Sequence, residues 1–406
     1  MATEYPWPVN SGSRLRLANT LQALRMCGPV DFFAVVAQTR VDFAPVPDEL
    51  GLERVQRITI DDRPPGVGDY MRAFARRWAP FELPLREGAK VQRALSEFTS
   101  GAEMSGTERG RYHLVWYFQV RAWVLAGEVS LAPSVVDIDD LEDQKILARV
   151  ALPRHDASAG DRLRRRAGLL WTHRDARRWQ ALHRRIAGRV AATVVCSELD
   201  ARRSGLPGVR VIANGYPTPP RPVGRDTVSS PPVVVFQGTL RYPPNADAAR
   251  FLVEDIGPRL RALVPGVQIR LVGLAPPALA GLADPPAVTL VGPVPDIDTE
   301  LAVADLIVIP LRYASGTRVK ILEAFAHRIA VVSTSIGAEG LDVRAGQHLL
   351  VADDPDGIAQ ACARLLEDHS LRQAIVDEAH ALYLAHYQSP QVQAELGVLA
   401  REVADP

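Results

Sequence analysis

The stretch LIVIPLRYASGTRVKILEAF, residues 306–325, reads as a buried strand, a turn of small residues and an amphipathic helix. The apolar run at 306–310 has the length and β-branched content of a strand in a parallel sheet. The turn contains Gly316, and the helix is expected to begin at Arg318. A strand that leads through a short turn into a helix is the repeating unit of α/β domains with parallel sheets.

The same alternation extends in both directions from this stretch. Strands are expected at 32–37, 54–60, 113–118, 134–138, 193–196 and 210–213 in the first half, and at 233–237, 268–272, 288–291, 306–310, 331–333 and 349–351 in the second. Helical patterns lie between them, including 140–189, 245–263 and 318–327, and the chain after Pro355 is expected to be all helical. The pattern predicts an α/β fold of two Rossmann-like domains with parallel sheets.

The predicted domain borders follow from composition. The 406 residues favour two domains, because a single core stops growing near about 250 residues. Residues 217–232 are rich in proline, which resists helix and sheet alike, and they are predicted to link a first domain, 1–216, to a second, 233–387. Residues 388–406 are expected to form a helix that packs back on the first domain.

The beginning of the chain fits this pattern poorly. The segment from Tyr5 to Gly12 leaves no room for an ordinary first strand, which is usually central in such a sheet. Two explanations are open. The native start lies upstream of Met1, which we favour, or the first sheet lacks its middle strand and leaves two strand edges unpaired.

Composition excludes several classes of protein. The chain has 47 Lys plus Arg and 47 Asp plus Glu, so general basicity gives no reason to expect a nucleic-acid partner. No apolar run reaches the roughly 18 to 20 residues of a membrane span, and no signal peptide is visible, so the cytoplasm is the expected location. The three cysteines form no CxxC pair, and neither a structural metal nor a cofactor is expected.

The turn and helix at 316–323 carry the strongest chemical signal. Backbone N–H groups at Gly316 and Thr317 would face an anion, and Arg318 and Lys320 add positive charge in the first helical turn. Cations at this end of a helix oppose its dipole unless an anion binds, so an anionic ligand is favoured over simple exposure to solvent. Glu323 shares a helix face with Lys320 and is suited either to a ribose diol or to an ordinary surface ion pair.

Several motifs together resemble the GT-B glycosyltransferases of family 4, in particular bacterial sugar transferases of that family. They are FQGTLR at 236–241, VGPVPD at 291–296, the stretch at 306–325, SIGAEGL at 335–341, VCSE at 195–198, IANG at 212–215 and DIDDLE at 137–142. The resemblance covers about residues 5–388 and is more specific in the second half. It implies a retaining, metal-independent transferase of hexosyltransferase type (EC 2.4) that binds a nucleotide-diphosphate sugar between two Rossmann-like domains.

The resemblance also assigns residues to the donor. Glu323 matches the second glutamate of the family's E-x7-E motif, which binds the ribose, and Gly238 matches the glycine whose loop approaches the diphosphate. Val294 falls in the loop that contacts the base, and Gly12 matches the glycine of the first loop near the donor phosphate.

Two departures from the family pattern stand out. The first glutamate of E-x7-E is Ser315 here, which implies a different recognition of the transferred sugar. Thr239 and Asn245 occupy the places of a frequent arginine and lysine, so Arg241, Arg318 and Lys320 are the substitute cations. We predict that Arg318 and Lys320 hold the leaving diphosphate, whose charge grows as the glycosidic bond breaks.

Three carboxylates and a histidine in the first half are further candidates. Asp137, Asp139 and Asp140 suggest an acceptor-side site, N-capping of the next helix by Asp139 or Asp140, or a metal-binding Asp-x-Asp pair, which we favour least. His113 precedes a predicted strand and is a weaker catalytic candidate, since a lone histidine there is more often structural.

The predicted partners are a nucleotide sugar and a glycan, lipid-linked or natural-product acceptor. Residues 161–189 hold ten arginines, with Leu169, Leu170, Trp171 and Trp179. They suggest peripheral contact with an anionic membrane, binding of an anionic acceptor, or a solvated helix. The rival functions are a GT-B nucleotide-sugar epimerase and a non-catalytic GT-B subunit. The base, the sugar and the oligomeric state have no signature in the sequence.

Overall fold

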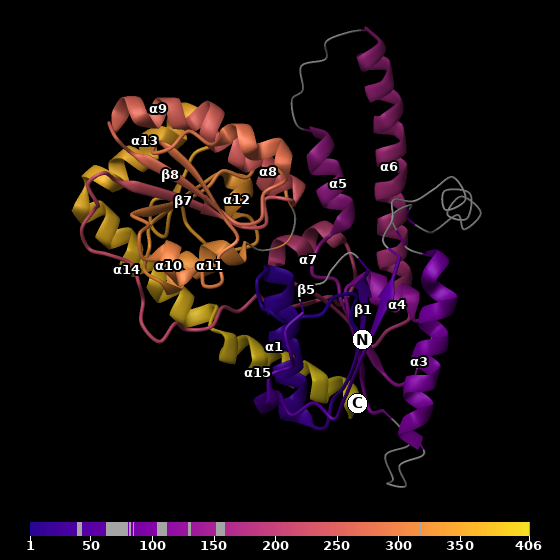
Figure 1. Ribbon diagram of the computed structural model, residues 1–406. Helices are drawn as coiled ribbons and strands as arrows, with labels where there is room; N and C mark the ends of the chain where they lie inside the picture. The colour runs from indigo at the N-terminus through magenta and orange to yellow at the C-terminus, as the bar shows by residue number, and fades with distance from the viewer. Residues whose placement is uncertain are drawn as a thin grey trace. The chain divides into compact units, whose positions relative to one another are not determined.

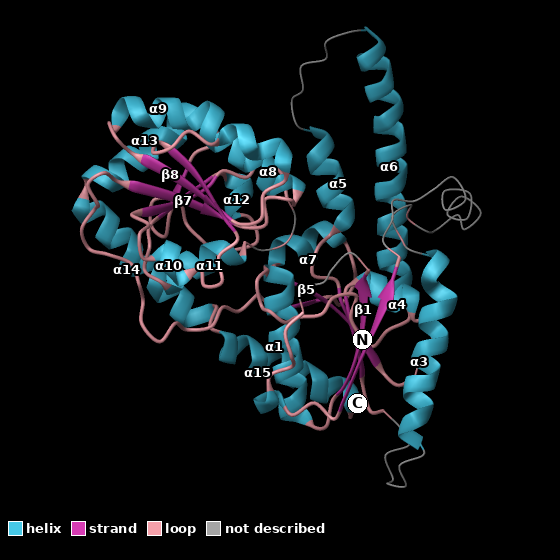
Figure 2. Ribbon diagram, viewed as in Figure 1, coloured by secondary structure: helices cyan, strands magenta, loops and turns pink. Residues whose placement is uncertain are grey.

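The computed structural model describes residues 1–38, 43–61, 80, 83, 85–103, 112–128, 131–151, 159–314, 316 and 318–405. The chain forms two compact units, shown in Figures 1 and 2. Unit 1 comprises Met1–Ala213 and Val392–Pro406, and unit 2 comprises Asn214–Gln391. The proline-rich segment 217–232 falls within unit 2, where the buried Asp305 carboxylate accepts hydrogen bonds from the Ser229 and Val233 amides.

Unit 1 contains a parallel sheet with helices on its faces (Figure 2). Its strands are β1 (Asp31–Ala37), β2 (Arg54–Ile60), β3 (Val115–Phe118), β4 (Ser134–Asp137), β5 (Ala192–Val195) and β6 (Arg210–Val211). Its helices are α1 (Gly12–Cys27), α3 (Gly88–Glu103), α4 (Val120–Leu125), α5 (Glu142–Ala151), α6 (Ala159–Ala187) and α7 (Glu198–Ser204), with short 3-10 turns at Asp48–Leu50 and Leu85–Glu87. The strands pair as β2-β1 and as β3-β4-β5-β6.

The first three residues of the chain join these two groups of strands. Ala2 forms parallel bridges with Ala34 of β1 and with Phe118 of β3. The Ala2 amide donates to Phe33 O at 3.0 Å, and the Phe118 amide donates to Met1 O at 2.9 Å. The expectation that the middle of this sheet is missing and leaves two unpaired edges is therefore wrong. With Ala2 in place, the order matches the 3-2-1-4-5-6 order of a Rossmann fold.

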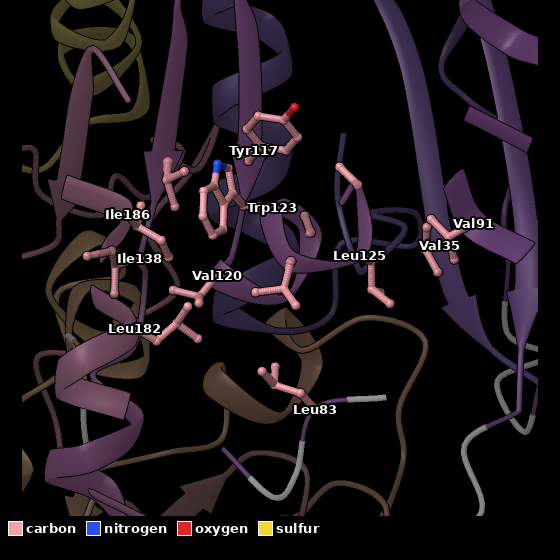
Figure 3. Packing of buried hydrophobic residues seen from close by; sticks show 14 of the residues in the cluster. Val35, Leu83, Val91, Tyr117, Val120, Trp123, Leu125, Ile138, Leu182 and Ile186 are labelled. Carbon is pink, nitrogen blue, oxygen red and sulfur yellow. The ribbon is translucent and has the colours of Figure 1, made fainter. Parts of the chain in front are cut away.

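Apolar side chains hold the helices of unit 1 against the sheet. Figure 3 shows Trp123 of α4 with Leu182 and Ile186 of α6, gathered around Tyr117 and Ile138 from the strand ends. Each of these five side chains is at most 3 % exposed.

Helix α15 (Ser389–Ala404) contributes to the other side of unit 1. Val392, Leu396 and Leu399 of α15 pack with Trp116 and Val135 of the sheet. The last helix is thus part of the core of unit 1, although the chain reaches it only after completing unit 2.

Unit 2 contains one six-stranded parallel sheet. Its strands are β7 (Val233–Gln237), β8 (Gln268–Val272), β9 (Val288–Gly292), β10 (Leu306–Ile309), β11 (Val331–Ser333) and β12 (Leu350–Val351), in the order β12-β11-β10-β7-β8-β9. Its helices are α8 (Pro243–Arg250), a π-helical turn at Phe251–Ile256, α9 (Gly257–Leu263), a 3-10 turn at Pro277–Leu282, α10 (Asp298–Leu301), α11 (Val319–Ala326), α12 (Ser335–Ala338), α13 (Pro355–Glu367) and α14 (His369–His386). This is the Rossmann strand order, and it reverses between β7 and β10.

The prediction of an α/β fold with parallel sheets is confirmed in both units. Ten of the twelve predicted strands lie within one residue of the observed bounds at both ends, and β3 and β6 are shorter than predicted by two residues at one end. None of the helices in the described part of the chain has the length and apolar character needed to cross a membrane.

Candidate functional site

The residues singled out in unit 2 meet where its strand order reverses. Strand β7 ends at Gln237 and is followed by Gly238, while β10 ends at Ile309 and leads to Gly316 and helix α11. In open α/β sheets, ligands bind outside the carboxyl ends of the strands at this reversal point. The topology therefore brings the glycine loop and the charged helix to the same edge of one sheet.

Gly238 lies in a position that a larger residue could not occupy without displacing its neighbours. Its φ of 142° is in the region that L residues rarely adopt. A Cβ atom there would approach Asn245 Nδ2 to 2.9 Å and Lys320 Nζ to 3.0 Å. The absence of a side chain thus keeps the backbone of this loop close to the lysine.

Lys320 places its ammonium group beneath the glycine loop. Nζ donates a hydrogen bond to Asn245 Oδ1 at 3.0 Å and lies 4.7 Å from the centre of the Phe236 ring. Among the described residues, no carboxylate oxygen lies within 4.0 Å of Nζ. Burial and the charge of Arg318 together lower the pKa of Lys320 to about 7, although Glu323 opposes the shift.

Glu323 lies one turn along α11 from Lys320, and two neutral donors hold its carboxylate. The Tyr216 hydroxyl donates to Oε1 at 2.8 Å, and Gln237 Nε2 donates to Oε2 at 3.1 Å. Burial raises the pKa of Glu323, whereas both hydrogen bonds favour its ionised form. A carboxylate offers about four acceptor positions, so capacity remains for hydroxyl donors of a ligand.

Arg318 occupies the position directly before α11 and is 6 % exposed. Its guanidinium turns back to donate to the Gly316 carbonyl and to Ile336 O at 3.5 Å. Gly316 has a φ of 71°, consistent with a glycine turn at this point. Ser315 and Thr317, both predicted to contact the donor, lie outside the described residues.

Arg241 and Val294 lie on the loops after β7 and β9. The Arg241 side chain is exposed, and its backbone amide donates to Leu274 O at 3.1 Å. Val294 is half-buried, two residues beyond Gly292. Of the three substitute cations named from the sequence, Lys320 and Arg318 are packed into the site, whereas Arg241 extends toward solvent.

The carboxyl edge of the sheet in unit 1 holds a different group of charges. Arg16 of α1 donates through Nε to both oxygens of Asp137, at 3.0 and 2.8 Å, and both residues are at most 2 % exposed. Arg16 Nη1 also donates to Ile212 O at 3.0 Å. This ion pair ties α1 to the end of β4 and to the segment after β6. Asp137 is thus a structural anion, and no three His, Cys, Asp or Glu side chains in the described part of the chain are arranged to hold a metal.

Asp139 follows two residues after Asp137 and has a φ of 57°. Its amide donates to Asp137 Oδ1, and Cys196 Sγ lies 3.6 Å from its Oδ1. Burial and then the charge of Asp140 raise the pKa of Asp139 to about 8, although the charge of Arg16 opposes the rise. Asp140 itself lies 3.6 Å from Lys145 Nζ. Helix α5 begins at Glu142, two residues after Asp140, and N-capping by Asp139 or Asp140 stays a prediction.

Two other candidates in unit 1 occupy separate positions. Gly12 begins α1, directly after Ser11, whose hydroxyl accepts a hydrogen bond from the Arg14 amide. His113 is exposed and precedes the amino end of β3. That end of the strand is opposite to the edge where ligands bind in such sheets, so the structure does not bring His113 to the other candidates.

Sequence reasoning missed three side chains that shape these sites. Tyr216 and Gln237 hold Glu323, and Arg16 neutralises Asp137. Gln237 carried a usable signal, because it is a polar residue at the end of an otherwise apolar strand. Tyr216 and Arg16 carried none, since they contact partners more than 100 positions away in the sequence.

Comparison with known proteins agrees with this geometry. The family model described as "Glycosyl transferases group 1" matches residues 231–368, which contain Gly238, Lys320 and Glu323. The chain is 24% identical over 169 residues to an uncharacterized 44.6 kDa protein in the cps region of Klebsiella pneumoniae, a match that spans 39% of this chain and 43% of the relative.

Solved structures resemble the fold over nearly the whole chain. HepE of Anabaena in complex with UDP-glucose has a TM-score of 0.65 at 16% identity, covering 99% of this chain and 98% of that one. Sucrose-phosphate synthase from Thermosynechococcus elongatus has a TM-score of 0.63 at 15% identity, covering 97% and 94%. A glycosyltransferase from Rickettsia africae has a TM-score of 0.61 at 12% identity, covering 97% and 96%.

The predicted GT-B fold is confirmed by these likenesses, which at such low identities concern the fold alone. The comparisons thus show a GT-B fold over nearly the whole chain and, at residues 231–368, similarity to the group 1 glycosyl transferases.

Proposed function

We propose that the protein is a retaining glycosyltransferase of family 4 that transfers a sugar from a nucleotide-diphosphate sugar to a hydroxyl group of an acceptor, with no metal or cofactor. The observation that carries this proposal is the position of the Lys320 ammonium, 3.0 Å from Asn245 Oδ1 and beneath Gly238. Asn245 occupies the place where family members often carry a lysine. Helix α11 thus supplies from the opposite side the positive charge that the loop lacks.

The other residues of unit 2 have matching roles in this proposal. The Gly238 loop admits the diphosphate close to the backbone, Lys320 and Arg318 neutralise it, and Glu323 accepts hydrogen bonds from the ribose. The loop around Val294 contacts the base. As the bond from the sugar carbon to the diphosphate oxygen breaks, negative charge grows on the leaving group, and fixed cations at a partly buried site stabilise it.

Ser315 differs from the glutamate that usually contacts the transferred sugar, so we expect recognition of that sugar to depend on other groups. HepE was crystallised with UDP-glucose and the pneumococcal O-GlcNAc transferase GtfA with UDP and GlcNAc. A uridine donor is therefore the first to test.

We place the acceptor at the carboxyl edge of unit 1, with Asp139 as the residue that receives its hydroxyl group. Asp137 is engaged by Arg16, and Asp140 lies beside Lys145. Asp139→Asn is expected to lower sugar transfer without weakening donor binding, and Asp140→Asn is the matched control. Equal loss of transfer in both variants would count against this role for Asp139.

The acceptor belongs to the glycan, lipid-linked or natural-product classes in this proposal. A lipid-linked acceptor would be met at a membrane surface, and peripheral membrane contact is proposed on separate grounds, from the exposed face of α6.

A thermal-shift panel of nucleotide diphosphates and their sugars tests the donor site. A ligand that binds only the folded protein raises its melting temperature, by an amount that grows with concentration. We expect a rise for at least one nucleotide diphosphate and its sugar, and release of that nucleotide diphosphate when an acceptor is added. Release without an acceptor would favour a hydrolase, in which water takes the sugar. Conversion of the nucleotide sugar to a stereoisomer without net release would favour an epimerase. No shift with any nucleotide would contradict the proposal.

A further inference from the structure

Helix α6 presents two opposite faces along residues 168–187. On one face, Trp179, Leu182 and Ile186 are completely buried in the core of unit 1, as Figure 3 shows for the last two. On the opposite face, Leu170 is 75% exposed. Trp171, one position on and about 100° further around the helix, is also 57% exposed. The described part of the chain has no large apolar side chain more exposed than Leu170.

Exposed arginines continue the same face. Arg174 and Arg177 follow Leu170 by four and seven positions, which places all three on one side of a helix. Arg184 is exposed about two turns further on. Leucine and tryptophan side chains are therefore followed by a line of positive charges, over a helix length of about 21 Å between positions 170 and 184.

Negative charge is nearly absent from this part of the helix. Residues 168–187 include five arginines and a single acidic residue, Asp175, which is 7% exposed. The preceding helical segment, residues 159–167, adds four arginines and one aspartate in the sequence. Arginines thus outnumber acidic residues along this helix by nine to two.

This combination of side chains suits the surface of an anionic membrane. Tryptophan favours the boundary between headgroups and acyl chains, and leucine gains free energy when it leaves water for the acyl region. Arginines on the same helix attract anionic headgroups, and each one near the surface strengthens binding about fivefold at low salt. A protein partner would need its own apolar pocket beside an acidic patch, whereas an anionic bilayer presents both features everywhere.

We propose that the exposed surface of α6 formed by Leu170, Arg174 and Arg177, together with the neighbouring Trp171, docks the protein on an anionic lipid surface. Contact is peripheral, with Leu170 and Trp171 inserted at headgroup depth and the arginines against lipid phosphates. The inference goes beyond the proposed transferase function and does not depend on it, because docking is measured with the protein alone.

Co-sedimentation of the full chain with vesicles tests the proposal. Vesicles of equimolar phosphatidylglycerol and phosphatidylcholine are expected to bind the protein at about 20 mM salt and to release most of it at about 500 mM, where charges are strongly screened. Vesicles of phosphatidylcholine alone are expected to bind at least tenfold less. Failure to bind the anionic vesicles at low salt would overturn the proposal.

Matched variants separate this face from the rest of the surface. Leu170→Ser with Trp171→Ser is expected to weaken binding at least tenfold. Leu384→Ser, which removes a leucine that is 40% exposed on α14, is expected to leave it unchanged. Arg174→Glu with Arg177→Glu is expected to abolish binding at low salt. Equal binding by the variants and the wild type would place the contact elsewhere and overturn the assignment.

Fluorescence and size measurements provide a second route if a variant folds poorly. Among the described residues, Trp7, Trp116, Trp123 and Trp179 are at most 7% exposed, and Trp78 lies outside the described residues. In a Trp78→Phe background, insertion of Trp171 should therefore dominate any blue shift on anionic vesicles. Trp171→Phe should bind the vesicles and lose that shift. The alternative outcome is a dimer that forms through this face. It would appear as a concentration-dependent change in size that Leu170→Ser with Trp171→Ser removes, while the protein fails to bind vesicles. That result would overturn the lipid assignment in favour of a second copy of the chain.

Discussion

The carboxyl edges of the two parallel sheets use a cation in opposite ways. In unit 1, Arg16 contacts both oxygens of Asp137, and the pair binds α1 to the strand ends. In unit 2, Lys320 contacts an amide oxygen, and the charges that act on it are Arg318, which opposes its protonation, and Glu323, which favours it. One edge neutralises its own charge, whereas the other keeps a cation for which a ligand can supply the anion.

Two sheets with the same strand order can therefore differ in the role of their carboxyl edges. Both sheets follow the Rossmann order, and both place polar residues after the central strands. The chemistry differs because a carboxylate faces the cation in one unit and a neutral amide faces it in the other. A function must therefore be argued from the side chains at each edge.

The largest effect is expected from breaking the pair in unit 1. Arg16→Met leaves the Asp137 carboxylate, which is 0% exposed, without its cation. Loss of one partner of a buried ion pair costs about 3–5 kcal/mol, which corresponds to a fall of about 6–20 °C in the melting temperature of a unit of this size. Scanning calorimetry measures the change. A fall under about 3 °C would show that the pair does not hold unit 1 together.

Replacing the cation of unit 2 by methionine is expected to lower activity and not stability. Lys320→Met removes a cation that is poorly solvated and repelled by Arg318, so the melting temperature without ligand should stay level or rise. Loss of one fixed group that stabilises transition-state charge typically lowers kcat about 100-fold or more. Steady-state release of nucleotide diphosphate measures this loss. Retention of more than about a tenth of wild-type kcat/KM, a loss under about 1.4 kcal/mol, would remove Lys320 from the mechanism.

The pH dependence of donor binding should distinguish Lys320 further from Arg16. The pKa of Lys320 is about 7 in the free protein, and a bound diphosphate favours its charged form, so the complex holds more protons than the free protein above that pH. Affinity for the nucleotide sugar is therefore expected to fall as pH rises through 7, by about tenfold between pH 6 and pH 8.

Calorimetric titration in buffers of different ionisation enthalpy measures this proton directly. At pH 8, wild-type protein is expected to take up about 0.9 proton per donor bound, and Lys320→Met almost none. The nucleotide-sugar diphosphate itself does not titrate in this range, which makes it a better probe than the free nucleotide diphosphate. Uptake by both proteins alike would assign the proton to another group.

Sequence reasoning succeeded where a signal is local and repeated. Strands such as 233–237 and 331–333 are short apolar runs between helical patterns, and the structure confirms both at the predicted residues. Three residues are too few to show a period of two, so the strand-like role of Met1 to Thr3 had no signature in the sequence.

The candidate site was predictable in its parts but not in its contacts. The turn at Gly316 and the positions of Lys320 and Glu323 on one helix follow from spacing alone. The contact of Lys320 with Asn245 joins positions 75 apart, and that of Tyr216 with Glu323 joins positions 107 apart. Such pairs depend on how helices and loops pack on the sheet, which a pattern along one chain does not encode.

The smallest expected effect tests most directly whether Lys320 takes the place of the lysine that family members often carry at position 245. If α11 supplies the charge that the loop lacks, a lysine restored at Asn245 should partly replace the one lost at 320, because the two side chains meet at 3.0 Å. Asn245→Lys in the Lys320→Met background is expected to recover about fivefold in kcat/KM, and Asn245→Lys alone to lower activity, since two ammonium groups would then face each other. Asn245→Gln with Lys320→Met, which restores size without charge, is the control. Equal recovery by lysine and glutamine would mean that Lys320 fills space under the glycine loop, and the contrast between the two sheet edges would then concern packing and not charge.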